Sequence, residues 1–355
     1  MAYTTIDDPS AYFHTQLYTG NGSSGLSITN DANAGDFQAD WLWIKPRSAS
    51  DNNVVFDSSR GEDKQLKTNG TDAEDTHSPA RVTFESDGFD LDTTDGNYNG
   101  NGTTYVAWQW KANGGTTSSN SDGSITSTVQ ANTTAGFSII TYTGNGTAGA
   151  TVGHGLGAVP SVIINKGRDE DRPWAVYHHK NTSAPETDYL RLDTDTATTD
   201  EATIWADTAP TSAVFTAGDH SSSNRAGDSF VGYFWNEVQG YSKFGTFTGN
   251  GNDDGPFVYT GFRPAWTMIK CTSAADHWPI DDNKRSPHNF MQNTLRANLT
   301  NAEYTGSAYG IDFLSNGFKV RNDDGQYNLN NGTFVYMAFA ESPFVNSNGV
   351  PANAR

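Results

Sequence analysis

The sequence predicts an all-β protein built from three tandem antiparallel β-sandwich repeats with little helix. One observation is a motif of an aromatic residue, threonine and Gly-Asn-Gly, which occurs at residues 18–22, 142–146 and 247–251. This pattern is typical of a strand that runs into a tight turn. A second observation is the composition, with 36 glycines, 18% charged residues and long Asn, Thr and Ser stretches, which favours short strands and many turns. Helical spacing of apolar residues is almost absent.

The first repeat is predicted over residues 15–111, after an N-terminal arm at residues 1–14 that we expect to dock on a neighbour. The run Asp-Trp-Leu-Trp-Ile-Lys at 40–45 is apolar at consecutive positions, which predicts a strand buried on both faces. A Ser-Asp-Gly turn predicts a hairpin of the segments on either side of it. The strands predicted for this repeat lie at 15–19, 40–45, 54–57, 82–84, 88–91 and 105–110.

Residues 112–134 are predicted to be a linker that can bend or extend. The segment is rich in Gly, Ser, Thr and Asn, and its only apolar aliphatic residues besides alanine are Ile125 and Val129. Such a composition is typical of flexible connections between domains.

The second and third repeats are predicted at residues 135–238 and 239–345, followed by a polar C-terminal tail at 346–355. Pro160 precedes Lys166, and Pro264 precedes Lys270, by six positions in each case. This spacing predicts equivalent strands with a proline at the entrance and a lysine at the exit. The connection between the two repeats is short, so we expect them to form one rigid block. Seven or eight strands in roughly one hundred residues are typical of a sandwich.

The sequence disfavours nucleic acid and membranes as partners. The formal net charge is −19, which repels phosphate backbones. No run approaches the roughly 18 apolar residues of a membrane span, and the N-terminus lacks the basic and apolar regions of a signal peptide. We therefore expect a soluble protein made in the cytoplasm. The only cysteine, Cys271, excludes an internal disulfide framework and is expected to be a buried free thiol.

Two matches to the dinucleotide fingerprint G-x-G-x-x-G, at residues 20–25 and 144–149, are interpreted as hairpin turns. A strand precedes each match, but no helix is predicted after it, and the pyrophosphate needs a helix N-terminus. The third copy loses the spacing at residues 249–255. No cofactor is therefore predicted.

Metal binding is not assigned to any residue. Asn250, Asn252 and Asp254 resemble half of a calcium loop, but its twelfth position is Gly261 rather than a bidentate carboxylate. Acidic clusters in predicted loops leave calcium binding open against solvated acidic turns. These clusters are Asp90, Asp92 and Asp95, and Asp193, Asp195 and Asp200.

No catalytic residue is predicted, and the protein is expected not to be an enzyme. His178 and His179, near Asp188, are adjacent on a strand, so we expect them to point to opposite faces and one of them to face solvent. His154 lies between glycines and is expected to bond to backbone in a turn. A glycosidase needs two facing carboxylates, but candidates are too numerous among forty-one acidic residues to be specific. They include Glu85, Asp87, Glu237 and Glu341.

The nine tryptophans are divided between the core and possible sugar-stacking positions. Four of them recur in repeat-related strands, which predicts burial. These are Trp43, Trp108, Trp174 and Trp235. Trp41 and Trp205 are the better candidates for exposure.

Four segments resemble a family of marine tailed-phage proteins. They are residues 2–9 (Ala-Tyr-Thr-Thr-Ile-Asp-Asp-Pro), 40–45, 152–157 (Val-Gly-His-Gly-Leu-Gly) and 337–344 (Met-Ala-Phe-Ala-Glu-Ser-Pro-Phe). The resemblance spans nearly the whole chain. It implies a virion or appendage component with concanavalin-like or jelly-roll sandwiches, and it brings no catalytic or ligand-binding residues to carry over.

The function expected from these observations is that of a structural protein of a tailed bacteriophage virion. It would be a tail-fibre or capsid-appendage or decoration component that presents sandwich domains to the host surface. The expected partners are other virion proteins and further copies of the chain, with a trimer favoured. A lectin-like adhesin that binds a host-surface glycan is the alternative, and a polysaccharide depolymerase is the second alternative. Recognition is expected where the repeats differ, at residues 57–79, 181–210 and 283–307.

Overall fold

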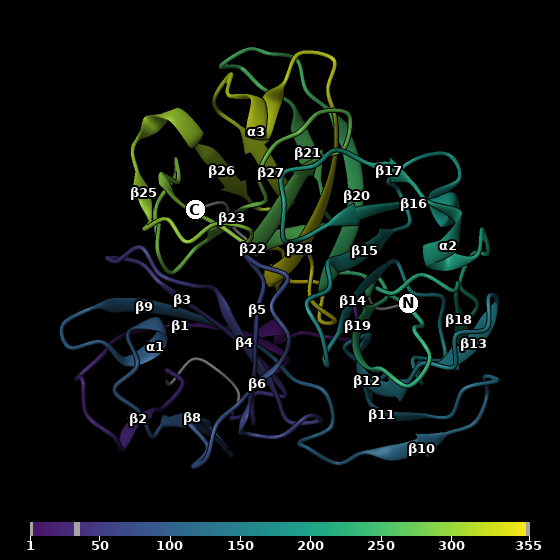
Figure 1. Ribbon diagram of the computed structural model, residues 1–355. Coiled ribbons are helices and arrows are strands. Elements are labelled where there is room, and N and C mark those ends of the chain that lie inside the picture. Colours follow the sequence, from purple (N-terminus) through teal and green to yellow (C-terminus); the bar gives the residue numbers. More distant parts are fainter. Residues whose placement is uncertain (1–2, 32–35, 353–355) are drawn as a thin grey trace.

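The computed structural model describes residues 3–31 and 36–352, which form an all-β protein of antiparallel sheets (Figure 1). The predicted all-β sandwich class is confirmed. Within these ranges, no helix is long and apolar enough to cross a membrane. The first two residues of the predicted arm and residues 353–355 of the predicted tail lie outside the described residues.

Three large sheets, one from each repeat, carry the fold, and six of their strands follow the same spatial order. In the first repeat the order is β1 (Phe13–Thr19), β9 (Thr104–Trp110), β3 (Trp41–Pro46), β4 (Val54–Asp57), β5 (Lys64–Lys67) and β6 (Asp75–Thr76). In the third repeat it is β20 (Ser242–Thr248), β28 (Thr333–Pro343), β22 (Phe262–Cys271), β23 (Pro279–Asp282), β24 (Asn293–Arg296) and β25 (Tyr304–Thr305).

The large sheet of the second repeat has eight strands, because two more precede the shared six. Its order is β10 (Ser118–Asn120), β11 (Ser127–Asn132), β12 (Phe137–Thr143), β19 (Ser229–Trp235), β14 (Val162–Gly167), β15 (Trp174–His178), β16 (Asp188–Arg191) and β17 (Thr199–Asp200). The segment predicted as a flexible linker therefore contains β10 and β11, and that prediction is wrong for these residues. Figure 1 shows β11 beside β12 and β10 beyond β11.

A small sheet covers one face of each large sheet and completes a sandwich with its own apolar core. The small sheets are β2 (Leu26–Ile28), β8 (Gly88–Leu91) and β7 (Val82–Glu85); β13 (Ala150–Gly153) and β18 (Val214–Ala217); and β21 (Phe257–Tyr259), β27 (Gly317–Val320) and β26 (Ile311–Leu314). The predicted hairpin of the first repeat is β7 and β8. The short helices are α1 (Gly96–Asn99), α2 (Ala202–Trp205) and α3 (Gly325–Asn328), with 3-10 turns η1 (Pro9–Ala11), η2 (Pro185–Thr187) and η3 (Ser307–Tyr309).

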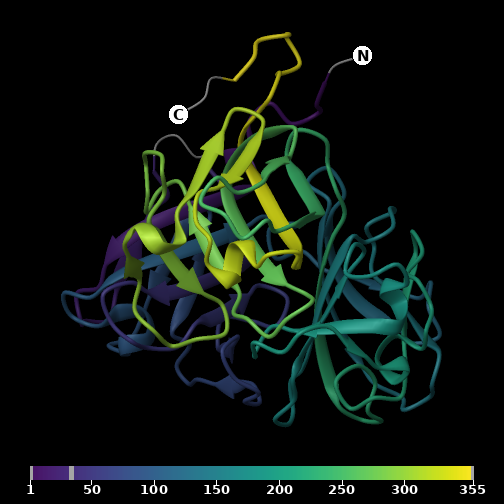
Figure 2. The ribbon, with the colours of Figure 1, turned by 90° about the horizontal axis from the view of Figure 1, so that it is seen from above.

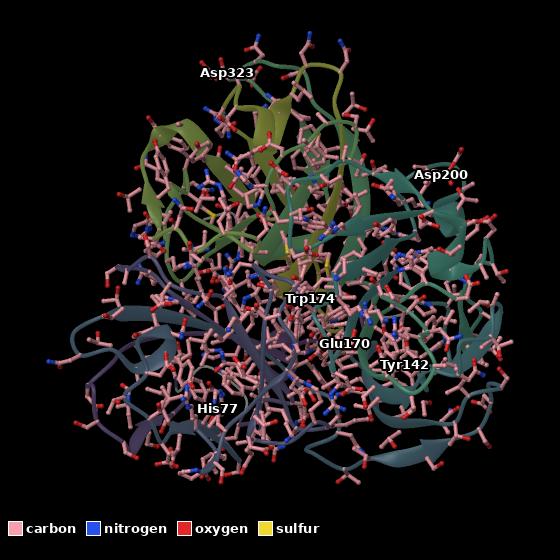
Figure 3. All side chains as sticks on the ribbon, in the orientation of Figure 1. His77, Tyr142, Glu170, Trp174, Asp200 and Asp323 are labelled. Atoms are coloured by element: carbon pink, nitrogen blue, oxygen red, sulfur yellow. The ribbon has the colours of Figure 1, made fainter. Side chains whose placement is uncertain are left out.

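The opposite faces of the three large sheets meet in one central core. Figure 1 shows the repeats arranged around this centre, and Figure 3 places Trp174 close to it. Strand β3 shows why its sequence has no polar alternation. Trp41 and Trp43 point into the central core, whereas Leu42 and Ile44 point into the core of the first repeat. A strand covered on both faces needs apolar residues at consecutive positions.

Trp110 connects the three repeats within the central core. Its ring centroid lies 4.6 Å from that of Trp41 in its own repeat, 6.4 Å from Trp235 in the second repeat and 5.6 Å from Trp266 in the third. The contacts with Trp235 and Trp266 are edge-to-face, an arrangement favoured by the ring quadrupoles. The expected rigid block of two repeats therefore extends to all three.

The N-terminal arm docks on the chain itself. Ile6 is buried in the central core, the Thr4 hydroxyl donates to the carbonyl of Gln239 at 2.8 Å, and the Tyr3 hydroxyl donates to the carbonyl of Gly261 at 2.7 Å. Figure 2 shows that the described start of the arm and the chain just before residue 353 lie on the same side of the molecule. The arm thus ties the start of the first repeat to the third repeat and to the central core.

We predict that the protein unfolds in one cooperative transition and that Trp110→Ala destabilises all three repeats together. Removing this buried ring should lower the free energy of unfolding by about 3–5 kcal/mol, because the cavity opens where the repeats meet. Calorimetry and chemical denaturation measure both effects. Phe257→Ala, at a residue 46% exposed, is the control and should change stability by less than about 0.5 kcal/mol. Separate transitions for individual repeats would contradict the shared core.

Candidate functional site

Each Gly-Asn-Gly motif is clamped by a buried asparagine from a distant part of its own repeat. The side-chain oxygen of the buried asparagine accepts from the backbone N–H of the motif asparagine. The pairs are Asn21 with Asn99 (2.9 Å), Asn145 with Asn224 (2.8 Å) and Asn250 with Asn328 (2.7 Å). A Cβ on Gly20 would meet the carbonyl oxygen of Gly100 at 2.4 Å, so this position requires glycine. The motif is a structural turn between a large and a small sheet. The prediction that these Gly-Asn-Gly motifs form hairpin turns is wrong, because β1 pairs with β9 and β2 pairs with β8.

Two of the acidic candidates for metal binding, Asp95 and Asp193, accept hydrogen bonds from the local backbone. Asp95 caps α1 and its carboxylate lies 2.5 Å from Arg81, while Asp193 accepts from the N–H of Trp174. Asn250 and Asn252 each accept a backbone N–H two residues further along the chain. Among the residues that the structure describes, no three His, Cys, Asp or Glu side chains are grouped so that they could hold a metal ion.

The two adjacent histidines both form hydrogen bonds to the third repeat. The prediction that one of them faces solvent is therefore wrong. His178 is buried, its Nε2 donates to the carbonyl of Tyr336 at 3.2 Å, and its Nδ1 accepts from the N–H of Lys180. His179 lies just beyond β15 and its Nε2 donates to the carbonyl of Phe244 at 2.7 Å. Burial lowers the pKa of His178 to about 3, so the neutral ring is the form that fits both of its hydrogen bonds.

His154 is confirmed as a turn histidine bonded to backbone. Its Nε2 donates to the carbonyl of Thr211 at 3.1 Å, and its Nδ1 accepts from the N–H of Leu156 at 3.2 Å. Burial lowers the pKa of this ring, and its imidazole stacks on Phe234.

The candidate carboxylates lie in different elements, and Glu237 and Glu341 are paired with different cations. Glu237 accepts from Lys243 at 2.7 Å, Glu341 lies 3.1 Å from Arg263, and Glu85 ends strand β7. Asp188 accepts from the hydroxyl of Thr182 rather than from a histidine. These contacts join neighbouring segments of the fold.

All nine tryptophans are at least 97% buried. The four recurring positions are core residues as predicted, but the expected exposure of Trp41 and Trp205 is wrong. Trp41 packs against Tyr233 in the central core, and Trp205 belongs to the core of the second repeat. Phe257 and Tyr259, on β21, are exposed aromatic residues. Cys271 is a buried free thiol, as predicted.

The contacts between repeats form a cycle, and we call them the first junction (repeats 1 and 2), the second junction (repeats 2 and 3) and the third junction (repeats 3 and 1). One buried lysine bridges each junction by donating to one carbonyl of its own repeat and one of the adjacent repeat. Lys45 donates to Thr300, Lys166 to Thr71 and Lys270 to Asp195, at 2.9 Å in each case. Burial lowers the pKa of all three lysines to about 8.

A buried ion-pair network holds the first junction. Arg60 pairs with Asp57 and lies 2.9 Å from Glu74, and Arg168 of the second repeat donates two hydrogen bonds of 2.8 Å to Glu74. The hydroxyl of Tyr233 donates to Asp57 at 2.7 Å across the same junction. Arginine with bidentate carboxylate contacts gives a directional, charge-assisted link.

The third junction repeats this network. Arg285 pairs with Asp282 and lies 3.1 Å from Glu303, which accepts two hydrogen bonds from Arg47 of the first repeat. The indole N–H of Trp108 donates to Asp282 at 3.0 Å, in the place of the tyrosine hydroxyl at the first junction.

The second junction keeps this arrangement with neutral side chains. The registers of the strands place His178, Asn181 and Thr198 where the first junction has Asp57, Arg60 and Glu74. The hydroxyl of Thr198 donates to Asn181 at 2.6 Å. One backbone hydrogen bond across the junction is common to all three junctions. Here it runs from the N–H of Thr198 to the carbonyl of Thr272 at 3.0 Å. These networks were not predicted from the sequence, although Asp-x-x-Arg recurs at the end of the same strand in the first and third repeats.

An open cleft of about 480 Å³ lies at the third junction, between β1 and the turn that follows β23. Phe13, Thr15 and Asn283 line it together with charged side chains. Lys284 pairs with Asp31 across its wall. The sequence did not predict this cleft, because its walls come from the two ends of the chain.

We predict that Arg285→Met costs about 3–5 kcal/mol of folding stability, because it leaves Asp282 buried without its cation and leaves Glu303 with Arg47 alone. Chemical denaturation measures the effect. Arg321→Met is the matched control, since Arg321 is 45% exposed and lies 3.6 Å from Asp312, and it should change stability by less than about 1 kcal/mol. Equal losses in both variants would show that the buried network has no special role.

We predict that acid weakens the protein partly through His178. Its pKa is about 3 in the folded protein and 6.5 as a free group, so below pH 6.5 the unfolded chain binds one more proton. Stability contributed by this group is present above pH 6.5 and falls by about 1.4 kcal/mol per pH unit as the pH drops toward 3. Denaturation of wild type and His178→Gln at pH 7 to 4 should show a steeper loss in wild type. Parallel curves would contradict the assignment.

The comparisons with known proteins identify one family. A search finds no match among curated proteins and none among solved structures. Residues 8–343 match the family described as Domain of unknown function (DUF7483). The match covers all three repeats and their junctions. The chain therefore belongs to the DUF7483 family.

Proposed function

We propose that the protein is a non-enzymatic structural component of a tailed-phage virion, such as a tail-fibre or capsid-appendage or decoration protein. The observation that supports this most is the closure of three equivalent sandwiches around one core. A single chain thereby has the form of a compact trimer. Virion appendages are often symmetric oligomers, so this form suits a position on such a particle, by analogy.

The junctions support a load-bearing role in that assembly. Each is sealed by a buried lysine, and two of the three also by arginine-carboxylate networks. Directional polar contacts inside a shared apolar core hold the sandwiches in one relative orientation. A rigid unit of this kind presents its outer loops at set positions.

The surface charge is also suited to a particle component. A net charge of −19 keeps the protein soluble at high local concentration and disfavours non-specific contact with nucleic acid. The resemblance of several segments to marine tailed-phage proteins supports the choice of a tailed-phage virion as the particle.

We predict that the protein sediments with intact phage particles. An antibody raised against the folded chain should label purified virions in electron microscopy, and the protein should follow the particle peak in a density gradient. A lysate treated to disrupt particles is the control, in which the protein should leave that peak. A protein found only in the soluble fraction of an intact lysate would rule out a virion role.

A further inference from the structure

Strands β1, β12 and β20 occupy equivalent positions in the three large sheets. The backbone groups on their outer sides have different partners. Antiparallel pairing directs the backbone groups of alternate residues toward the neighbouring strand and those of the others away from it. In β1, Tyr12 and Gly20 bond to the β9 side, so the N–H and C=O of Thr15 point outward. By the strand registers, Ile139 and Phe244 occupy the same position in β12 and β20.

In the second repeat, a strand completes the edge. Strand β11 pairs antiparallel with β12, and Gln130 lies opposite Ile139. The side-chain amide of Gln130 then crosses the first junction and donates to the hydroxyls of Ser58 and Ser59 at 2.9 and 2.8 Å. Backbone pairing and one amide side chain thus fill this position.

In the third repeat, side chains complete the edge. The N–H of Phe244 donates to Glu237 at 3.1 Å, and its carbonyl accepts from His179 at 2.7 Å. Both outward backbone groups are therefore satisfied without an added strand.

In the first repeat, the equivalent position faces the cleft. Within the described part of the chain, the hydroxyl of Thr15 has no hydrogen-bond partner although the residue is only 4% exposed. Asn283, which is 5% exposed, occupies the place of Ser58 and His179 and lines the same cleft. Buried polar groups without partners are costly, and the hydroxyl of Thr15 belongs to a residue that lines a cavity of about 480 Å³.

We propose that this cleft binds an extended segment of another polypeptide, which adds to β1 as an antiparallel strand. The chain itself supplies the template, because β11 adds to β12 at the equivalent edge. Strand addition of this kind uses backbone hydrogen bonds for affinity and side-chain positions for selectivity. The inference is independent of the proposed function.

The cleft also indicates the composition of the segment. Its wall charges lie close to opposite charges, Lys284 beside Asp31 and Arg263 3.1 Å from Glu341, so a charged segment gains little. Strand β11 has the sequence Ser-Thr-Val-Gln-Ala-Asn and no charge. The bound segment is therefore uncharged, and it carries a glutamine or asparagine opposite Thr15 that bonds to Asn283.

A labelled peptide with the sequence of residues 124–134 is the probe, and fluorescence anisotropy with the full chain is the measurement. We expect saturable binding that weakens at least about tenfold in Thr15→Pro, because proline removes the outward N–H but no bond to β9. Thr19→Pro, on the same edge and outside the cleft, should bind as wild type does. Asn283→Ala should weaken binding severalfold through loss of one amide contact.

Circular dichroism establishes that each variant is folded, and Asn283→Ala decides the matter if Thr15→Pro does not fold. No saturable binding up to about 1 mM peptide, or equal binding by wild type and the cleft variants, would overturn the proposal. Self-association of the chain that Thr15→Pro abolishes would also overturn it, because the occupant would then be a second copy.

Discussion

The fold depends on the requirement that both faces of every large sheet be covered. A small sheet covers one face, and the other two large sheets together cover the opposite face. Trp110 contacts rings from all three repeats, so no repeat can leave this centre without exposing a sheet of aromatic residues to water. Burial of that area is the main favourable free energy that holds the repeats together.

The polar contacts between repeats follow from this arrangement. Where the strands leave the central core, their carbonyls and loop ends meet the adjacent repeat away from water. Lys45, Lys166 and Lys270 satisfy such carbonyls at equivalent places, although burial disfavours their charge. The second junction shows that the fold does not require the arginine networks, since His178 and Asn181 occupy their positions there. The three junctions keep the same arrangement of strands, while the side chains that meet there differ.

Much of the fold could be predicted from the sequence, because its signals are local. The triplicated turns and the apolar runs at the central strands reflect burial and turn geometry within one repeat. The position of β11 could not be predicted in this way, because its pairing with β12 uses backbone groups and needs few apolar side chains. Trp41 was misassigned because recurrence of residue type is a poor guide when Val162 and Trp266 fill the same position in the other repeats. The cleft depends on which distant turn meets which edge, and no single segment records that.

The joining of three sandwiches in one chain has a genetic consequence. In a trimer of identical subunits, every substitution appears at all three interfaces at once, so an interface can change only if three copies of the change are tolerated. In this chain each junction is encoded by its own residues. One can therefore become neutral around His178, another can remain ionic around Arg60, and the edge at Thr15 can stay unfilled, while the common centre keeps the whole molecule folded.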